Sequence, residues 1–128
     1  MATNEFGLSK IGQIAVNAHD LDRATAFYRD QLGMKLLFAV PPRMCFFDCD
    51  GIRLMLSLPD RQELDHASSI IYFNVDDIQH AVTTLKQRGV EFLEDAHVVA
   101  DMGTYHLWMA AFRDSENNLL AMQSNVAK

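Results

Sequence analysis

Blocks of hydrophobic and polar residues follow one another along the chain, and their order is the same in both halves. Each half begins with an apolar, β-rich segment, continues with a segment of helical periodicity, and ends with further strand-like segments. An aspartate precedes each helical segment (Asp20 and Asp77) and a glycine ends it (Gly33 and Gly89), as helix caps require. The pattern predicts two β-α-β-β-β units.

The units are expected to span about residues 8–58 and 68–124, in a single domain of 128 residues. The Asp50-Gly51 pair is a strong signal for a tight turn between two strands. The strands are predicted at residues 11–17, 35–40, 44–49, 52–58, 69–75, 90–93 (with its extension to residue 99 left open), 105–112 and 119–124.

The internal repeat is clearest in the hairpins. Residues 46–55 match residues 112–121 without a gap, so that Met55 corresponds to Ala121. Gln13 and Ile70 also correspond, because each lies seven residues before its capping aspartate. A duplicated unit builds two similar half-sheets, and we expect a binding cleft where the halves face each other.

Strand alternation divides the side chains between two faces of the predicted sheets. One face is uniformly apolar, with residues such as Val16, Leu54 and Met122, and should pack under the helices. The other face is mixed, as a cavity wall would be. On the predicted strand 105–112, His106 and Trp108 share a face, and we place both toward the cavity.

Composition limits the classes of function. The 49% hydrophobic and 22% charged content is typical of a soluble globular protein. No apolar run approaches the ~20 residues of a membrane span, and residues 1–5 lack a secretory pattern. We therefore expect a cytoplasmic protein without a membrane partner. The formal net charge of −6 argues against nucleic acid and mildly favours cationic partners, although a role in solubility is the simpler explanation.

The two cysteines are predicted to be reduced. Cys45 and Cys49 lie four residues apart on one predicted strand, which separates them by roughly 13 Å along an extended chain. That separation is too large for a disulfide between them. We expect both to be core or cleft residues.

The chain resembles the vicinal oxygen chelate superfamily, which includes glyoxalase I, bleomycin-resistance proteins and extradiol dioxygenases. The resemblance covers residues 11–124 and rests on the paired units, on residues 21–28 (LDRATAFY) with 32–34 (LGM), and on residues 112–119 (FRDSENNL). It implies an α+β fold in which two tandem βαβββ units form a curved mixed sheet, and it implies a homodimer. It leaves the reaction open, because this superfamily hosts many chemistries.

One motif departs from the superfamily's usual pattern. Ser115 and Asn117 replace the proline and glycine of an Asp-Pro-Asp-Gly turn. Asparagine tolerates the left-handed conformation that such a turn needs. We therefore expect the turn to survive.

The resemblance also identifies the positions that bind a metal ion in metal-dependent relatives. Carried over onto this sequence, they are Gln13, Met55, Ile70 and Ala121. Gln13 could donate a carbonyl oxygen and Met55 is a soft thioether, but Ile70 and Ala121 cannot coordinate a cation. We predict that the usual metal site is absent, and we predict no cofactor.

Two alternatives for the histidines stay open. His66, His97 and His106, which we place around the cleft, could form a non-standard divalent metal site, although their spacing matches no known ligand pattern. His106 could instead act as an acid or base, with Tyr105 and Asp101 close in sequence. A plain hydrogen-bonding histidine is the simpler interpretation.

The expected ligand-binding residues lie on the mixed face. Arg53 could meet an anionic group or form an ion pair at the rim, and Tyr72 and Trp108 could stack on a flat ligand. Met55 suits an adaptable apolar wall. The full predicted set is Gln13, Phe38, Phe47, Arg53, Met55, Tyr72, His106 and Trp108.

These observations favour a protein that binds a small hydrophobic, aromatic or cationic molecule without a metal, as bleomycin-resistance proteins sequester drugs. The alternative is a lyase, isomerase or oxidoreductase that uses a displaced metal, or His106 as an acid or base. A third alternative is a structural or regulatory partner protein whose cleft is filled by its own apolar side chains.

Overall fold

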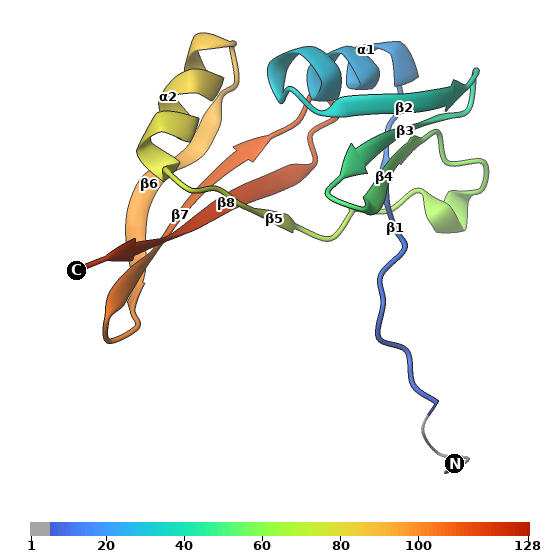
Figure 1. Ribbon diagram of the computed structural model, residues 1–128. Coiled ribbons are helices and arrows are strands. Elements are labelled where there is room, and N and C mark those ends of the chain that lie inside the picture. Colours follow the sequence, from blue (N-terminus) through green and yellow to red (C-terminus); the bar gives the residue numbers. More distant parts are fainter. Residues whose placement is uncertain (1–5) are drawn as a thin grey trace.

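A computed structural model describes residues 6–128 of the protein. It shows two β-α-β-β-β units, each a four-stranded sheet with a helical segment on one face (Figure 1). The predicted α+β class and tandem units are confirmed, and the strands form two separately hydrogen-bonded sheets. Residues 1–5, which carry the expectation about a secretory signal, lie outside the described residues.

The first sheet has the strand order β1-β4-β3-β2, with β1 parallel to β4 and the other neighbours antiparallel. Asp50 (φ 52°) and Gly51 (φ 92°) adopt left-handed conformations and close the predicted turn between β3 and β4. The strands are β1 (Gln13–Asn17), β2 (Lys35–Val40), β3 (Met44–Cys49) and β4 (Ile52–Ser57).

The second sheet repeats this plan, with the order β5-β8-β7-β6 and a parallel β5-β8 pair. Its strands are β5 (Ile71–Asn74), β6 (Phe92–Asp101), β7 (Tyr105–Arg113) and β8 (Leu119–Ala127). β6 is longer than the predicted strand, and its pairing with β7 shifts register at three places. These irregularities hide the alternation that would reveal the strand in the sequence.

Both helices begin at the predicted aspartates. The Asp20 carboxylate accepts a hydrogen bond from the Arg23 amide (3.0 Å), and the Asp77 carboxylate accepts one from the His80 amide (3.1 Å). The first helix is α1 (Leu21–Ala26), which continues as the π-helical segment η2 (Phe27–Gln31); the second is α2 (Ile78–Gln87), and a short 3₁₀ segment, η3 (Gln62–Leu64), lies between the units. No helix in residues 6–128 is both long and apolar enough to cross a bilayer.

One hydrophobic core runs through both units, between the helices and the sheets. The apolar sheet face predicted from the sequence forms its floor: Val16, Leu54 and Leu120 are almost fully buried. Tyr28 packs its ring against Phe47 at a centroid distance of 6.0 Å. The opposite, concave faces of the two sheets are left free of helices, as Figure 1 shows.

The two long hairpins differ by one residue. In the first unit Phe47 is paired with Leu54, whereas in the second unit Phe112 is paired with Leu120, so that the second loop is one residue longer. All four side chains are buried beneath the helices. The prediction of a gapless repeat is therefore wrong for β7: Phe112 is the counterpart of Phe47, not of Phe46.

Candidate functional site

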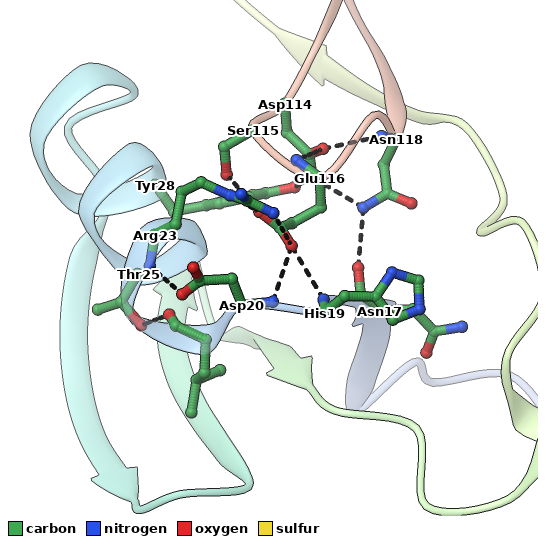
Figure 2. A network of polar contacts seen from close by, with 11 residues as sticks. Asn17, His19, Asp20, Arg23, Thr25, Tyr28, Asp114, Ser115, Glu116 and Asn118 are labelled. Carbon is green, nitrogen blue, oxygen red and sulfur yellow. Dashed lines mark hydrogen bonds and ion pairs between the residues drawn. The ribbon is translucent and has the colours of Figure 1, made fainter.

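The turn between β7 and β8 holds the two units together. The Asp114 carboxylate accepts hydrogen bonds from the Tyr28 hydroxyl (2.7 Å) and from the amides of Glu116 and Asn118 (2.8 Å each) (Figure 2). Asn117 has φ 69°, so the predicted left-handed residue is confirmed. The turn thus survives without the proline and glycine that relatives use.

Glu116, in the same turn, is hydrogen-bonded to residues at the beginning of α1. Its side chain is 1% exposed and accepts hydrogen bonds from the Arg23 guanidinium (2.7 and 3.1 Å) and from the amides of His19 (2.9 Å) and Asp20 (3.0 Å). Burial alone would raise the pKa of Glu116, but the hydrogen bonds from Arg23, His19 and Asp20 outweigh it and lower that pKa to about 2. Glu116 is therefore ionised and structural at neutral pH.

Further bonds between the units fix how the concave faces are held. The Asn118 side-chain amide donates to the Asn17 carbonyl (2.9 Å), at the end of β1. At the other end of the helices, the Gln31 amide donates to the Arg88 carbonyl (3.0 Å).

Burial, followed by the adjacent Asp114 carboxylate, raises the pKa of Tyr28 far above its usual range, so the phenol stays a hydrogen-bond donor.

The concave face of the first sheet carries an aromatic surface with a positive charge over it. The rings of Phe38 and Phe46 stack at a centroid distance of 4.6 Å. The Arg53 guanidinium carbon lies over both rings, 5.7 Å from the Phe38 centroid and 5.9 Å from that of Phe46. We call Phe38, Phe46 and Arg53 the arginine shelf.

Gln13 and Met55 lie beside the arginine shelf. Gln13 is opposite Arg53 in the β1–β4 register, and its side-chain amide donates to the Met55 sulfur at 3.6 Å. Met55 is opposite Phe46 in the β3–β4 register. The structure therefore brings together four predicted site residues, Gln13, Phe38, Arg53 and Met55.

Phe46 belongs to this group but was missed by the sequence reasoning. The tight Asp50-Gly51 turn sets the β3–β4 register, and that register places Phe46 on the same face as Met55. The signal was therefore present in the sequence. Phe47, which was predicted to contact the ligand, lies on the opposite face and is 0% exposed against Tyr28.

The concave face of the second sheet is shallower. Tyr72 is half-exposed and is paired with Ala121 across the β5–β8 register. They line a hollow of about 110 Å³ together with residues of β6 and β7, including His97 and Met109. Tyr72 thus lies where the sequence placed it.

The placement of His106 and Trp108 toward the cavity is wrong. Trp108 is paired with Ser124 and His106 with Val126, on the helix-facing side of β7. Trp108 packs against the core and borders the start of α2. The residues of β7 that face the concave side are Met109 and Ala111.

Comparison with known proteins identifies the fold. A family model described as the Glyoxalase/Bleomycin resistance protein/Dioxygenase superfamily matches residues 10–122. The chain belongs to this superfamily. The resemblance seen in the sequence is confirmed over almost the whole chain.

Solved structures of other superfamily members agree. A glyoxalase/bleomycin resistance protein/dioxygenase from Alicyclobacillus acidocaldarius is 28% identical, with a TM-score of 0.70 and 91% of each chain covered. A lactoylglutathione lyase from Agrobacterium tumefaciens is 22% identical (TM-score 0.74; 92% and 95% covered). A superfamily member from Sphaerobacter thermophilus is 21% identical (TM-score 0.76; 91% and 98% covered). At these low identities the last two show the fold alone.

The residues at the superfamily's metal positions do not fit a divalent ion. The strand registers support the carried-over positions, because Met55 pairs with Ala15 in β1 as Ala121 pairs with Tyr72 in β5. Their side chains offer one amide oxygen from Gln13 and one thioether from Met55, and nothing from Ile70 or Ala121. A hard or borderline cation needs more oxygen or nitrogen donors.

The alternative histidine site does not assemble within the chain. His97 lies on the concave side of the second sheet, His106 faces the helices, and His66 lies in the segment between the units. Among residues 6–128 no three His, Cys, Asp or Glu side chains are grouped closely enough to hold a metal ion. Cys45 and Cys49 are unbridged, and burial raises the pKa of each thiol.

A separate apolar cavity of about 380 Å³ lies on the helix side of the second sheet. It opens between α2 (Ala81 and Thr84) and the residues that follow η2 (Leu32 and Met34). Its volume is in the range of small-molecule pockets, so any binding experiment has to distinguish it from the concave faces.

Proposed function

We propose that this protein binds a small, partly aromatic molecule on its concave faces, without a metal ion at the superfamily's usual position. The observation that carries the proposal is that the superfamily's metal positions hold side chains suited to packing against a bound molecule and not to coordinating a metal ion. Met55 and Gln13 bond to each other where metal ligands stand in relatives, and the arginine shelf lies beside them. Aromatic faces and thioethers bind flat apolar groups by dispersion and shape.

We further propose that a second copy of the chain completes the cleft. β1 and β5 are terminal strands of their sheets, so each has an edge that can accept another strand. Large apolar side chains near these edges and on the concave faces are exposed, among them Phe38 (45%), Ile70 (43%) and Tyr72 (49%). In a homodimer, the first sheet of one copy could face the second sheet of the other. Such an arrangement would cover these exposed side chains.

The enzymatic alternative has less support. His106, its proposed acid or base, faces the helices and not the concave surface. The donor set at the metal positions does not suit a Lewis acid, as described above.

A blocking experiment tests the binding proposal with the neutral fluorophore N-phenyl-1-naphthylamine. Met55→Trp fills the concave face beside the shelf, and Ala15→Trp does the same from an exposed position on the neighbouring strand. Thr84→Trp instead fills the helix-side cavity and serves as the matched control. We expect the two concave-face variants to lose fluorophore binding and the control to retain it.

The fold of each variant is checked by its thermal transition, and the oligomeric state by sedimentation. If the fluorophore does not bind the wild-type protein, or if only Thr84→Trp abolishes binding, the proposal is wrong. If the protein is monomeric and still binds the fluorophore, only the proposal that a second copy completes the cleft is wrong.

A further inference from the structure

We infer that the ligand is an aromatic anion and that Arg53 binds its acidic group. This inference rests on the proposed function and narrows its ligand class. A carboxylate, sulfonate or phosphate would meet the guanidinium, and the apolar part of the ligand would lie across Met55 and the neighbouring strand. The position of Arg53, the absence of an acceptor for its guanidinium among residues 6–128 and the chemistry of its surroundings each support this assignment.

Arg53 is held in place by aromatic rings, not by a carboxylate. Its guanidinium carbon lies over Phe38 and Phe46, and the Phe46 ring is only 7% exposed. Contact with ring faces uses the flat side of a guanidinium and leaves the N–H groups at its edge available. Such an arrangement keeps the five donors oriented without consuming them.

The donors of Arg53 have no acceptor within residues 6–128. Asp48 lies opposite Arg53 in the β3–β4 register, but its carboxylate accepts the Gly51 amide (3.3 Å) in the turn. The contrast with other arginines is clear. Arg23 and Arg43 are paired with Glu116 and Asp60, and Arg88 donates to the Gln31 carbonyl. Arg53 is therefore the cation of the arginine shelf and is available to a ligand.

The surroundings of Arg53 favour a forked acidic group with an aromatic body. A guanidinium binds a carboxylate or a similar oxyanion through two parallel hydrogen bonds. The rings beneath it lower the local polarity, which strengthens such a pair relative to one in open water. Gln13 lies opposite Arg53 in β1, and its side-chain amide, which donates one hydrogen to Met55, carries a second that could bond to a further oxygen at the same place.

A cationic ligand, which the sequence left open, does not fit the arginine shelf. A positive group placed there would be repelled by Arg53 and would compete with it for the faces of Phe38 and Phe46. The overall charge of −6 does not change this local preference, because screening limits distant charges to about a Debye length, ~10 Å at moderate salt.

Two fluorophores that share a similar aromatic framework test the inference. 8-Anilinonaphthalene-1-sulfonate carries a sulfonate, and N-phenyl-1-naphthylamine carries no charge. We expect Arg53→Gln to weaken sulfonate binding roughly 10- to 100-fold, as for the loss of a charge-assisted hydrogen-bonded pair, and to change neutral binding little. Arg53→Lys should give an intermediate affinity, because the charge stays and the fork is lost.

Arg61→Gln is the matched control, because Arg61 is an exposed arginine outside both sheets. It should leave both affinities unchanged, and raising the salt concentration should weaken only the sulfonate. The inference is overturned if Arg53→Gln weakens both fluorophores equally or neither of them. That failure is distinct from failure of the proposed function, in which the concave-face tryptophan variants would still bind the neutral fluorophore.

Discussion

The Arg23 guanidinium donates two hydrogen bonds to the Glu116 carboxylate, at 2.7 and 3.1 Å, across 93 residues of sequence. Arg23 lies in the helix of the first unit, and Glu116 lies in the hairpin turn of the second. The pair therefore fixes one unit against the other. Since the concave faces lie on both units, the same pair determines how those faces are presented to a ligand.

Glu116→Gln is expected to destabilise the protein by about 2 kcal/mol. Removing one charge of a buried pair leaves the partner uncompensated, and the half-exposed Arg23 side chain limits the penalty. Urea unfolding of the variant measures the change. Glu63→Gln, at an exposed position in η3, is the control and should leave the free energy of unfolding unchanged.

The same carboxylate makes stability depend on pH. The pKa of Glu116 is about 2 in the folded protein, against 4.5 for an ordinary glutamate. A depressed folded-state pKa contributes stability that is complete above about pH 4.5 and is lost as the pH falls toward 2. The difference in unfolding free energy between wild type and Glu116→Gln should therefore shrink across this window. A difference that stays constant from pH 6 to 3 would contradict the assignment.

Tyr28→Phe removes the hydroxyl that donates to Asp114 at 2.7 Å in a buried position. We expect a loss of about 1 to 2 kcal/mol, because the carboxylate keeps three other donors. Absorbance at alkaline pH gives a second measurement. The pKa of Tyr28 is raised by burial and by Asp114, so Tyr28 should not ionise before the protein unfolds. An alkaline absorbance change that is larger in folded wild type than in folded Tyr28→Phe by the signal of one tyrosine would show that Tyr28 titrates while folded and would argue against this contact.

Much of the fold could be predicted from the sequence, because its signals are local. The capping aspartates, the Asp50-Gly51 turn and the apolar face of each strand lie within a few residues of the structures they specify. β6 could not be outlined, since its three register shifts break the alternation. The contact between Arg23 and Glu116 could not be predicted either, because it depends on how two distant segments pack.

The candidate site was predicted in part, and its errors lie on both sheets. Gln13, Phe38, Arg53 and Met55 gather as expected on the first sheet, where a two-residue turn fixes the register. Even there, Phe46 was missed and Phe47 was assigned to the ligand, because the register that separates the two faces of β3 was not followed. On the second sheet the turn is one residue longer and carries no two-residue turn signal, so the register that turns His106 and Trp108 toward the helices could not be predicted.

Asn117 is expected to be replaceable by glycine but not by valine. Its φ of 69° is left-handed, which glycine adopts freely and a β-branched residue adopts only with strain. Asn117→Gly should leave stability unchanged or raise it slightly, whereas Asn117→Val should cost about 1 to 2 kcal/mol. Thermal unfolding compares the two, with Asn125→Val in the exposed end of β8 as the control. Equal stability of the two position-117 variants would contradict the prediction.

Metal binding should return when donors are restored at the superfamily's positions. The wild-type side chains of Met55, Ile70 and Ala121 give a cation at most one soft donor. The triple variant Met55→Glu, Ile70→His, Ala121→Glu, with Gln13 retained, supplies two carboxylates, one imidazole and one amide oxygen. If the two concave faces meet in a dimer as proposed, this variant should bind Zn²⁺ or Ni²⁺ stoichiometrically.

Elemental analysis after purification without chelators, and calorimetric titration with each ion, compare metal binding by the variant with metal binding by the wild type. The single variant Met55→Glu is the control, because it leaves the second sheet without donors and should bind weakly. Stoichiometric transition metal in the wild-type protein would contradict the prediction, because the donors would then come from residues other than these four.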